Sequence, residues 1–163
     1  MKNIVYSLAL LAFSVVIGGA VYEHLAVIPQ WSAAPPESLA MFQGEYGLNA
    51  EAFWTRIHPI TIALCLLTLI LFWKTAARKN ILILLLGYVS VMVVTFIYFV
   101  PELIDITQTE FNSVVDDSLR SRAQLWETLS LLRLIVIIIL AIIFSLGLTK
   151  TDLKNQSNKE LIS

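Results

Sequence analysis

The chain has 163 residues, of which 58% are hydrophobic and only 14% are charged, and its formal net charge is −1. A soluble domain carries roughly 25% charged residues, so this composition excludes a soluble globular enzyme and a disordered chain. The near-zero net charge provides no basic surface, and no nucleic-acid partner is expected. The single cysteine, Cys65, excludes a disulfide framework and a cysteine-rich zinc site. The sequence therefore predicts an integral membrane protein surrounded by a lipid bilayer.

Four apolar runs have the length of a membrane span. They cover residues 4–22, 57–73, 81–101 and 128–148. A hydrocarbon core of about 30 Å needs roughly 20 apolar residues in a helix that rises about 1.5 Å per residue. Lipid offers the backbone no hydrogen-bond partners, and these runs do not alternate as barrel strands do, so we expect helices. The predicted fold class is all-α, a transmembrane four-helix bundle over residues 1–149 with a polar, disordered tail over residues 150–163.

The first of these runs also has features of a secretory signal, because Lys2 precedes it and small residues end it. Its apolar stretch is longer than the roughly 7–15 residues of a signal core, which favours an uncleaved helix.

Basic residues predict how the helices are oriented. Seven of the eleven fall on one side of the predicted membrane: Lys2, Lys74, Arg78, Lys79, Lys150, Lys154 and Lys159. Because positive loops stay in the cytoplasm, both termini are expected there, and the expected location is the bacterial inner membrane. Ten of the twelve acidic residues lie in or beside the two outer loops.

The two outer loops are long enough to have structure of their own. They run over residues 23–56 and 102–127, and loops longer than about 12–15 residues are usually functional or structured. In the first loop, the prolines of residues 34–38 indicate a short helix start, and Asn49 can cap the second span. In the second, Asp116 or Asp117 can cap a helix that continues into the fourth span. We therefore expect a partly helical cap on the extracytoplasmic end.

Ionisable and aromatic residues gather at the outer ends of all four predicted spans. They are Glu23, His24, Arg56, His58, Tyr98, Glu102, Arg122, Trp126, Glu127 and Arg133. Four packed helices must bring these groups together, so one outer polar site is expected. Arg122, Trp126 and Arg133 share one helix face, which also contains Ser130. If this face points inward, Arg133 meets Glu102 or Glu23 in an ion pair; the alternative is that Arg133 snorkels to the outer headgroups.

The same cluster contains groups that bind metals. Glu23, His24, His58 and Glu102 supply donors that suit zinc or iron. The sequence has no His-x-x-x-His or Glu-x-x-His pair, so no residue is assigned as a metal ligand. Glycine-rich nucleotide motifs and the Gly-x-Ser-x-Gly nucleophile motif are absent as well. The cofactor is left unassigned.

Short motifs along the chain point to a family. They are Gly-Ala-Val-Tyr-Glu at 19–23, Pro-x-Trp at 29–31, Phe-Trp-x-Arg-x-His-Pro at 53–59, Tyr-Phe-x-Pro-Glu at 98–102, and Arg-x-x-x-Trp at 122–126 with Arg133 behind it. Over residues 1–148 the chain resembles the small four-span membrane family of largely unknown function that includes the fungal anthrone oxygenases. The outer-loop sequence is similar to the bacterial, uncharacterised branch. The resemblance implies oxidation of a lipophilic aromatic molecule by O₂ without a required cofactor.

Such chemistry needs a base, a stabiliser for the resulting enolate and an apolar pocket. His58 is the plausible neutral base near pH 7. Arg133 or Arg122 can stabilise the anion, and Glu23 or Glu102 can orient the histidine.

Two classes of function therefore stay open. The first is a membrane enzyme that acts on a lipophilic small molecule at the extracytoplasmic end of the bundle. The second is a non-catalytic membrane module that binds a lipid, a quinone or a protein partner, and a metal-binding membrane protein is a further alternative. The residues expected to contact the ligand are Tyr98, Trp126, Arg122 and Trp54.

Cysteine-accessibility labelling tests the predicted orientation. A cysteine engineered at Ser38 should react with an impermeant reagent outside intact cells, because the first long loop is expected to face outward. A cysteine at Ser157 should react only after the membrane is opened. Labelling at position 157 from outside would refute the orientation.

Overall fold

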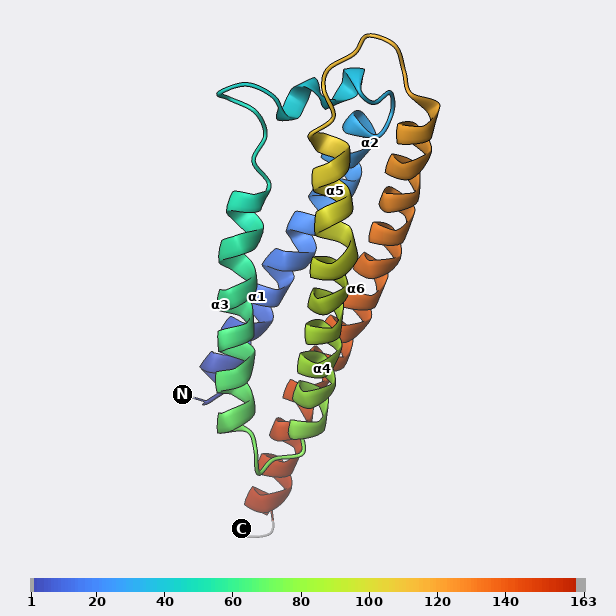
Figure 1. Cartoon of the computed structure of the whole chain (residues 1–163). Helices are drawn as coiled ribbons and strands as arrows, with labels where there is room; N and C mark the ends of the chain where they lie inside the picture. The colour runs from blue at the N-terminus through green and yellow to red at the C-terminus, as the bar shows by residue number, and fades with distance from the viewer. Residues whose placement is uncertain (1, 161–163) are drawn as a thin grey trace.

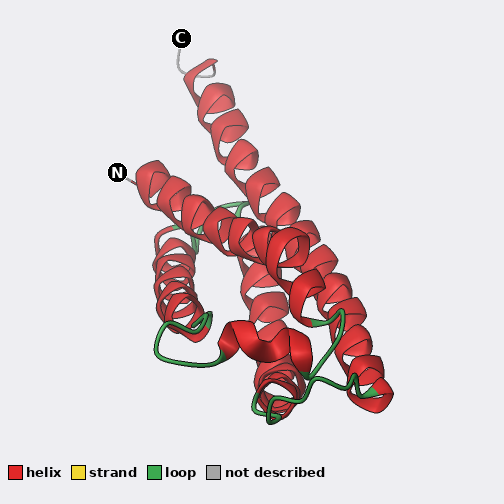
Figure 2. Ribbon diagram, turned by 90° about the horizontal axis from the view of Figure 1, so that it is seen from above, coloured by secondary structure: helices red, strands yellow, loops and turns green. Residues whose placement is uncertain are grey.

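The computed structural model describes the backbone of residues 2–160 and the side chains of residues 2–150, and it is all-helical with short connections (Figure 1). Figure 2, seen from above, shows helices and loops without a strand over the described backbone. In chain order the elements are α1 (Lys2–Tyr22), η1 (Glu23–Val27), α2 (Ile28–Trp31), η2 (Glu37–Phe42), α3 (Glu51–Leu71), α4 (Arg78–Val94), η3 (Thr95–Phe99), α5 (Val100–Thr107) and α6 (Asp117–Glu160). The predicted all-α four-helix fold is confirmed.

Four helical stretches are long and apolar enough to cross a membrane. They are Lys2–Trp31, Glu51–Leu71, Arg78–Thr107 and Asp117–Lys150. Less than a third of each stretch is buried inside the bundle, so most apolar side chains face outward; Leu86 is 68% exposed and Ile97 is 75% exposed. Soluble monomers rarely expose apolar patches larger than a few hundred Å². Such a surface suits a hydrocarbon environment.

The helices are longer than the predicted spans because polar side chains cap additional turns. α3 begins at Glu51, where the Asn49 side chain accepts a hydrogen bond of 3.1 Å from the amide of Ala52. α6 begins at Asp117, and Asp116 accepts hydrogen bonds from two amides of its first turn. Both capping residues act as the sequence predicts. At its other end α6 continues to Glu160, so the backbone of the predicted tail is helical up to there, and residues 161–163 lie outside the described residues.

The spans pack as a closed ring in which each helix has two neighbours. α1 packs against α3 and α6, and α4 packs against α6 and, less extensively, against α3. The main core draws its buried residues from all four spans: Tyr6, Ala9, Phe13, Val16, Cys65, Phe72, Ala77, Ile81, Leu84, Leu85, Tyr88, Met92, Ile137, Leu140 and Phe144. This core holds the helices together over most of their length.

A second core lies under the outer loops and forms the predicted cap. Its buried residues come from α2, η2, η3, α5 and α6: Ile28, Trp31, Leu39, Phe99, Ile106, Leu119, Ala123 and Trp126. The two long loops are joined where the amide of Asp116 donates to the carbonyl of Pro35 at 3.1 Å. The buried residues of this second core include none from α3, so the outer part of α3 is held by other contacts.

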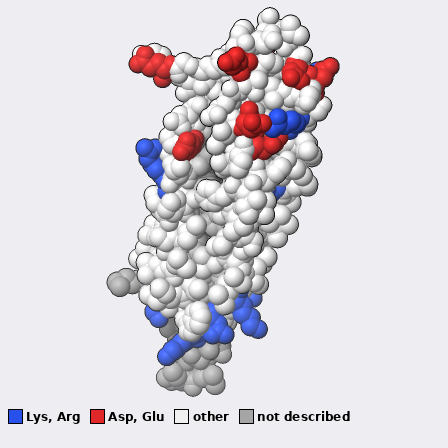
Figure 3. Space-filling view, viewed as in Figure 1, with Lys and Arg blue, Asp and Glu red and all other residues white. Residues whose placement is uncertain are grey.

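Charge is divided between the two ends of the bundle. Both chain ends lie opposite the cap in Figure 1. On the face shown in Figure 3, acidic side chains lie toward the cap end, whereas the opposite end carries basic ones. The predicted separation of charge is therefore present in the fold.

Two helices contain a wide π-type turn directly before a proline. In η1 the amide of Ile28 bonds to the carbonyl of Glu23, and in η3 the amide of Val100 bonds to the carbonyl of Thr95. Pro29 directly follows Ile28, and Pro101 directly follows Val100. Neither proline has an amide hydrogen that could continue the α-helical pattern. Such turns occur frequently at functional sites, and here they contain polar residues of the bundle interior.

At the end opposite the cap, α1, α4 and α6 are joined by polar contacts around a glycine. The Tyr6 hydroxyl donates to the carbonyl of Phe144. The Asn80 amide donates to the carbonyl of Ile143 at 2.6 Å, and its oxygen accepts from Lys150 at 3.0 Å. Gly147 lies so close that a Cβ there would collide with the Tyr6 hydroxyl and approach the Asn80 Cβ to 3.0 Å.

Replacing Gly147 with alanine should therefore lower stability, because Tyr6 is held by its hydrogen bond and has little room to move. We expect a loss of about 1–3 kcal/mol, as for other overpacked sites. Gly18→Ala is the matched control, since nothing lies within 4 Å of a Cβ at that helical glycine. The control should be neutral or gain up to about 1 kcal/mol of helix propensity. Thermal unfolding in detergent measures both, and equal effects would contradict the close approach.

Candidate functional site

The outer polar residues form two groups that make separate contacts. The group between the spans, called here the interhelical group, has two sets of contacts. Glu23, Trp54, His58 and Tyr88 form one set, and Thr95, Ser130 and Arg133 form the other. Arg133 interacts electrostatically with Glu23 and His58, which relates the two sets. The group on the cap, called the cap group, consists of Ser32, Glu102, Asp105, Arg122, Trp126 and Glu127. Among the described side chains, no hydrogen bond or ion pair joins the interhelical group to the cap group, so the residues expected at one polar site make two separate groups of contacts.

A chain of contacts links η1, α3 and α4 in the interhelical group. The indole nitrogen of Trp54 donates to Glu23 Oε1 at 2.8 Å. The Trp54 ring stacks on His58, with centroids 5.2 Å apart and planes 18° from parallel. His58 Nδ1 lies 2.6 Å from the hydroxyl of Tyr88, which is fully buried. Residues four apart lie on one face of a helix, so α3 presents Trp54 and His58 together to both neighbours.

Gly19 makes the first of these contacts possible. A Cβ at this position would lie 2.6 Å from the ring of Phe53 and 3.4 Å from the ring of Trp54. The missing side chain lets the two aromatic rings approach α1 closely. Four residues later, at the start of η1, Glu23 then comes within reach of the Trp54 indole.

The hydrogen bond between His58 and Tyr88 favours one tautomer of the histidine. The Tyr88 hydroxyl contacts no other hydrogen-bond partner among the described residues. A buried hydroxyl hydrogen needs an acceptor, so Tyr88 donates to Nδ1 and the proton of the neutral imidazole lies on Nε2. Nε2 contacts no hydrogen-bond partner within residues 2–150. This arrangement supports His58 as a donor toward a ligand better than as the base that the sequence suggested.

Arg133 is held between α6 and η3 by neutral groups. Its Nη1 donates to Thr95 Oγ1 at 3.1 Å and its Nη2 donates to Ser130 Oγ at 2.8 Å. The guanidinium carbon lies 4.1 Å from the centre of the Phe99 ring, which is close enough for a cation–π interaction. A guanidinium has five N–H donors, and these contacts use two of them.

The ion pair expected for Arg133 is absent. Among the side chains of residues 2–150, the ion pairs are those of Arg122 with Glu102 at 2.8 Å and with Asp105 at 2.6 Å. Arg133 and Glu23 interact electrostatically without direct contact. The expectation of a direct pair with either glutamate is therefore wrong, because Arg122 binds Glu102 and the hydroxyls and the Phe99 ring stabilise Arg133 instead.

The side chains of the cap group hold the outer helical segments against one another. The Arg122 pair is solvent-accessible, with side chains of Arg122, Glu102 and Asp105 exposed by 40%, 24% and 68%, and exposed pairs contribute only about 0–1 kcal/mol. Trp126 is buried and donates its indole N–H to the carbonyl of Phe99 at 2.9 Å. Glu127 accepts a hydrogen bond of 2.8 Å from Ser32. These contacts fix α5 and α2 against α6.

Tyr98, another residue expected to contact a ligand, is half-buried and packs against the cap core. Its ring meets Phe99 edge to face. Its hydroxyl makes no hydrogen bond among the described residues, which separates it from Tyr88.

The expected metal donors do not converge. The described residues contain no group of three or more His, Cys, Asp or Glu side chains that could hold a metal ion. His24 lies in η1, where its Nδ1 contacts the carbonyl of Ala20 at 2.8 Å, and its buried Nε2 has no partner among the described residues. Nothing in this geometry supports the metal-binding alternative.

Two residues of the interhelical group were not selected from the sequence. Tyr88 and Thr95 lie inside an uncharged span, where their neighbours in the sequence do not distinguish them from ordinary core residues. A search for hydroxyl residues at the same depth in the bundle as His58 or Arg133 could have found them. That depth, however, depends on how the helices are aligned with one another.

No protein-family model, curated protein or solved structure matches the chain. The function is therefore inferred from the residues and contacts of the interhelical group.

Removing one hydroxyl tests the contact between His58 and Tyr88. Tyr88→Phe should lower the free energy of unfolding by about 1–3 kcal/mol, because Nδ1 of the half-buried His58 loses its hydrogen-bond partner among the described residues. Tyr98→Phe removes the same atom where no partner contacts it, and should change stability by less than about 0.5 kcal/mol. Thermal unfolding of both variants in detergent is the measurement. A neutral Tyr88→Phe would show that the hydrogen bond does not form.

Proposed function

We propose that this protein is a membrane enzyme that acts on a lipophilic small molecule, whose oxygen atom binds between Arg133 and His58 in the cap-side half of the bundle. The observation that carries the proposal is the environment of the Arg133 guanidinium. The guanidinium is half-buried, and within residues 2–150 it contacts no carboxylate directly and uses only two of its N–H donors. A buried charge without a direct counter-ion is costly, and an anionic or strongly polarised oxygen would relieve that cost.

The geometry supports formation of an enolate or phenolate. Arg133 and the Nε2 proton of His58 can both donate to the oxygen where negative charge develops, and fixed donors in a site without water stabilise such charge strongly. Glu23 has one carboxylate oxygen bound to Trp54 and a second that accepts no hydrogen bond within residues 2–150. This second oxygen is our candidate base. When a proton moves from the ligand to Glu23, the negative charge moves from the Glu23 carboxylate to the ligand. The net charge of the site therefore stays the same.

A hollow on the outer surface of α3 supports access for a lipophilic molecule. Its volume is about 450 Å³ and its lining is Asn49, Ala52, Phe53, Arg56, Ile57 and Ile60. Phe53 belongs to this lining and also contacts the ring of Trp54, with centroids 4.8 Å apart. The stack of Trp54 on His58 thus begins directly behind the wall of the hollow. A ligand dissolved in the bilayer can approach from this side without crossing water.

The resemblance to the anthrone oxygenases adds the reaction class. In that chemistry the anion formed at the site is oxidised by O₂, and anthrone is the first compound to try. We further propose that the cap lies on the extracytoplasmic side of the bacterial inner membrane and that both termini are cytoplasmic. The basic residues at the end opposite the cap support this orientation.

Anthrone binding and oxygen uptake by the purified protein in detergent test the proposal. Arg133→Met should weaken binding, measured by quenching of tryptophan fluorescence, at least tenfold, because a hydrogen bond to a charged group contributes about 1.5–3 kcal/mol and 1.4 kcal/mol is a factor of ten. It should also abolish oxygen uptake. Arg122→Met is the matched control on the same helix and should retain both activities.

The possible outcomes separate the two classes of function. Loss of binding in both arginine variants would contradict a specific role of Arg133. Binding by the unaltered protein without oxygen uptake would support the non-catalytic binding module instead. Thermal unfolding of each variant shows whether a loss reflects misfolding, and Arg133→Lys, which keeps the charge, provides a milder second variant.

A further inference from the structure

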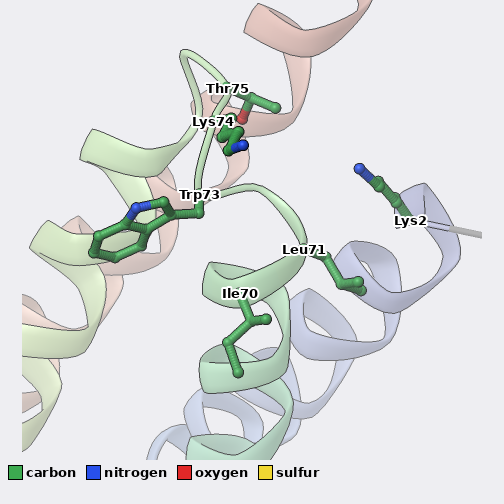
Figure 4. A pocket seen from close by; sticks show the side chains of 6 residues that line it. All are labelled: Lys2, Ile70, Leu71, Trp73, Lys74 and Thr75. Carbon is green, nitrogen blue, oxygen red and sulfur yellow. The ribbon is translucent and has the colours of Figure 1, made fainter.

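A second hollow lies at the opposite end of the bundle from the interhelical group. Its volume is about 530 Å³, and it is lined by Lys2, Ile70, Leu71, Trp73, Lys74 and Thr75 (Figure 4). Lys2 comes from the beginning of α1, and the other residues come from the end of α3 and the turn that follows it. The hollow therefore spans two elements that are far apart in the sequence.

The lining combines a positive rim with an apolar wall. The amines of Lys2 and Lys74 form no ion pair among the described residues, in which the ion pairs belong to Arg122. Ile70 and Leu71 supply the apolar wall. The guanidinium carbon of Arg78 lies 5.2 Å from the centre of the Trp73 ring, so this tryptophan is held in place beside the hollow.

The position of the hollow matches the boundary between the hydrocarbon core and the lipid headgroups. α3 ends at Leu71, and tryptophan and lysine are the residues that concentrate directly beyond the apolar part of a membrane helix. From the hollow toward the cap, the surface of α3 consists of exposed apolar side chains, with Ile70 exposed by 70% and Leu66 by 47%. A molecule bound here can place a charged group at the rim and an apolar chain along the helix.

We propose that this hollow binds an anionic phospholipid. Its phosphate lies between the amines of Lys2 and Lys74, and one acyl chain follows Ile70 and the apolar face of α3. Basic pockets at the ends of membrane helices suit acidic headgroups, and each lysine near the surface adds to the attraction. The apolar continuation distinguishes a lipid from a soluble phosphate compound, which would leave this wall uncovered. The bound lipid would connect the start of α1 to the turn between α3 and α4.

Native mass spectrometry of the full-length protein with added lipids tests this site. Dioleoyl phosphatidylglycerol should remain bound where dioleoyl phosphatidylcholine does not. The double variant Lys2→Gln/Lys74→Gln should weaken phosphatidylglycerol binding about 10- to 30-fold, because both amines are lost. Lys79→Gln/Lys154→Gln removes the same charge from the same predicted side of the membrane and should leave binding within about twofold of the unaltered protein.

Four outcomes would overturn the proposal. Equal losses in the two double variants would show attraction by overall charge without a specific site. Equal retention of the two lipids would show that the phosphate charge is not recognised. Displacement of phosphatidylglycerol by millimolar inorganic phosphate would assign the rim to a soluble anion. If the first double variant does not fold, each single variant should still weaken binding several-fold, and unchanged binding in both would refute the site.

Discussion

The polar groups inside this bundle must find their hydrogen-bond partners within the protein, because the outer surfaces of the spans are apolar and lipid offers no hydrogen bonds. The other contacts of the cap-side half follow from this constraint. Trp54 reaches Glu23 in η1, and His58 reaches Tyr88 on α4. Each of these contacts joins two spans, so the same interactions that satisfy the polar groups also fix how the helices are aligned.

Arg133 shows how a charge can be accommodated without a direct ion pair. The π-type turn η3 brings Thr95 and Phe99 to the guanidinium, while Ser130 reaches it from the preceding turn of α6. A hydroxyl and an aromatic face stabilise the cation less completely than a carboxylate would, which leaves donors available. The acidic residue that could have neutralised it, Glu102, is bound to Arg122 on the cap. This division of the charges is the basis of the ligand-binding role proposed for the interhelical group.

The two ends of the molecule have different physical properties and correspondingly different proposed roles. At the cap end, acidic loops cover a small apolar core, and the interhelical group lies between the spans beneath. At the opposite end, lysines surround a hollow with an apolar wall, and the contact of Tyr6 and Asn80 with α6 closes the bundle. The first arrangement suits a reaction or a ligand in the hydrocarbon phase. The second suits an anionic lipid at the membrane boundary.

The sequence by itself determined the helical fold, the number of spans and the caps at Asn49 and Asp116, because hydropathy and capping depend on residues close together in the chain. It also identified Glu23, His58 and Arg133 as residues in the cap-side half of the bundle. Only the tertiary structure decided the partners. Which residue meets Arg133 depends on the rotation and alignment of α6 against η3, and a rotation of one residue along a helix turns a side chain by about 100°. For this reason Glu102 was expected at Arg133 but binds Arg122, and the hydroxyls of Tyr88 and Thr95 acquired a role that their local sequence does not show.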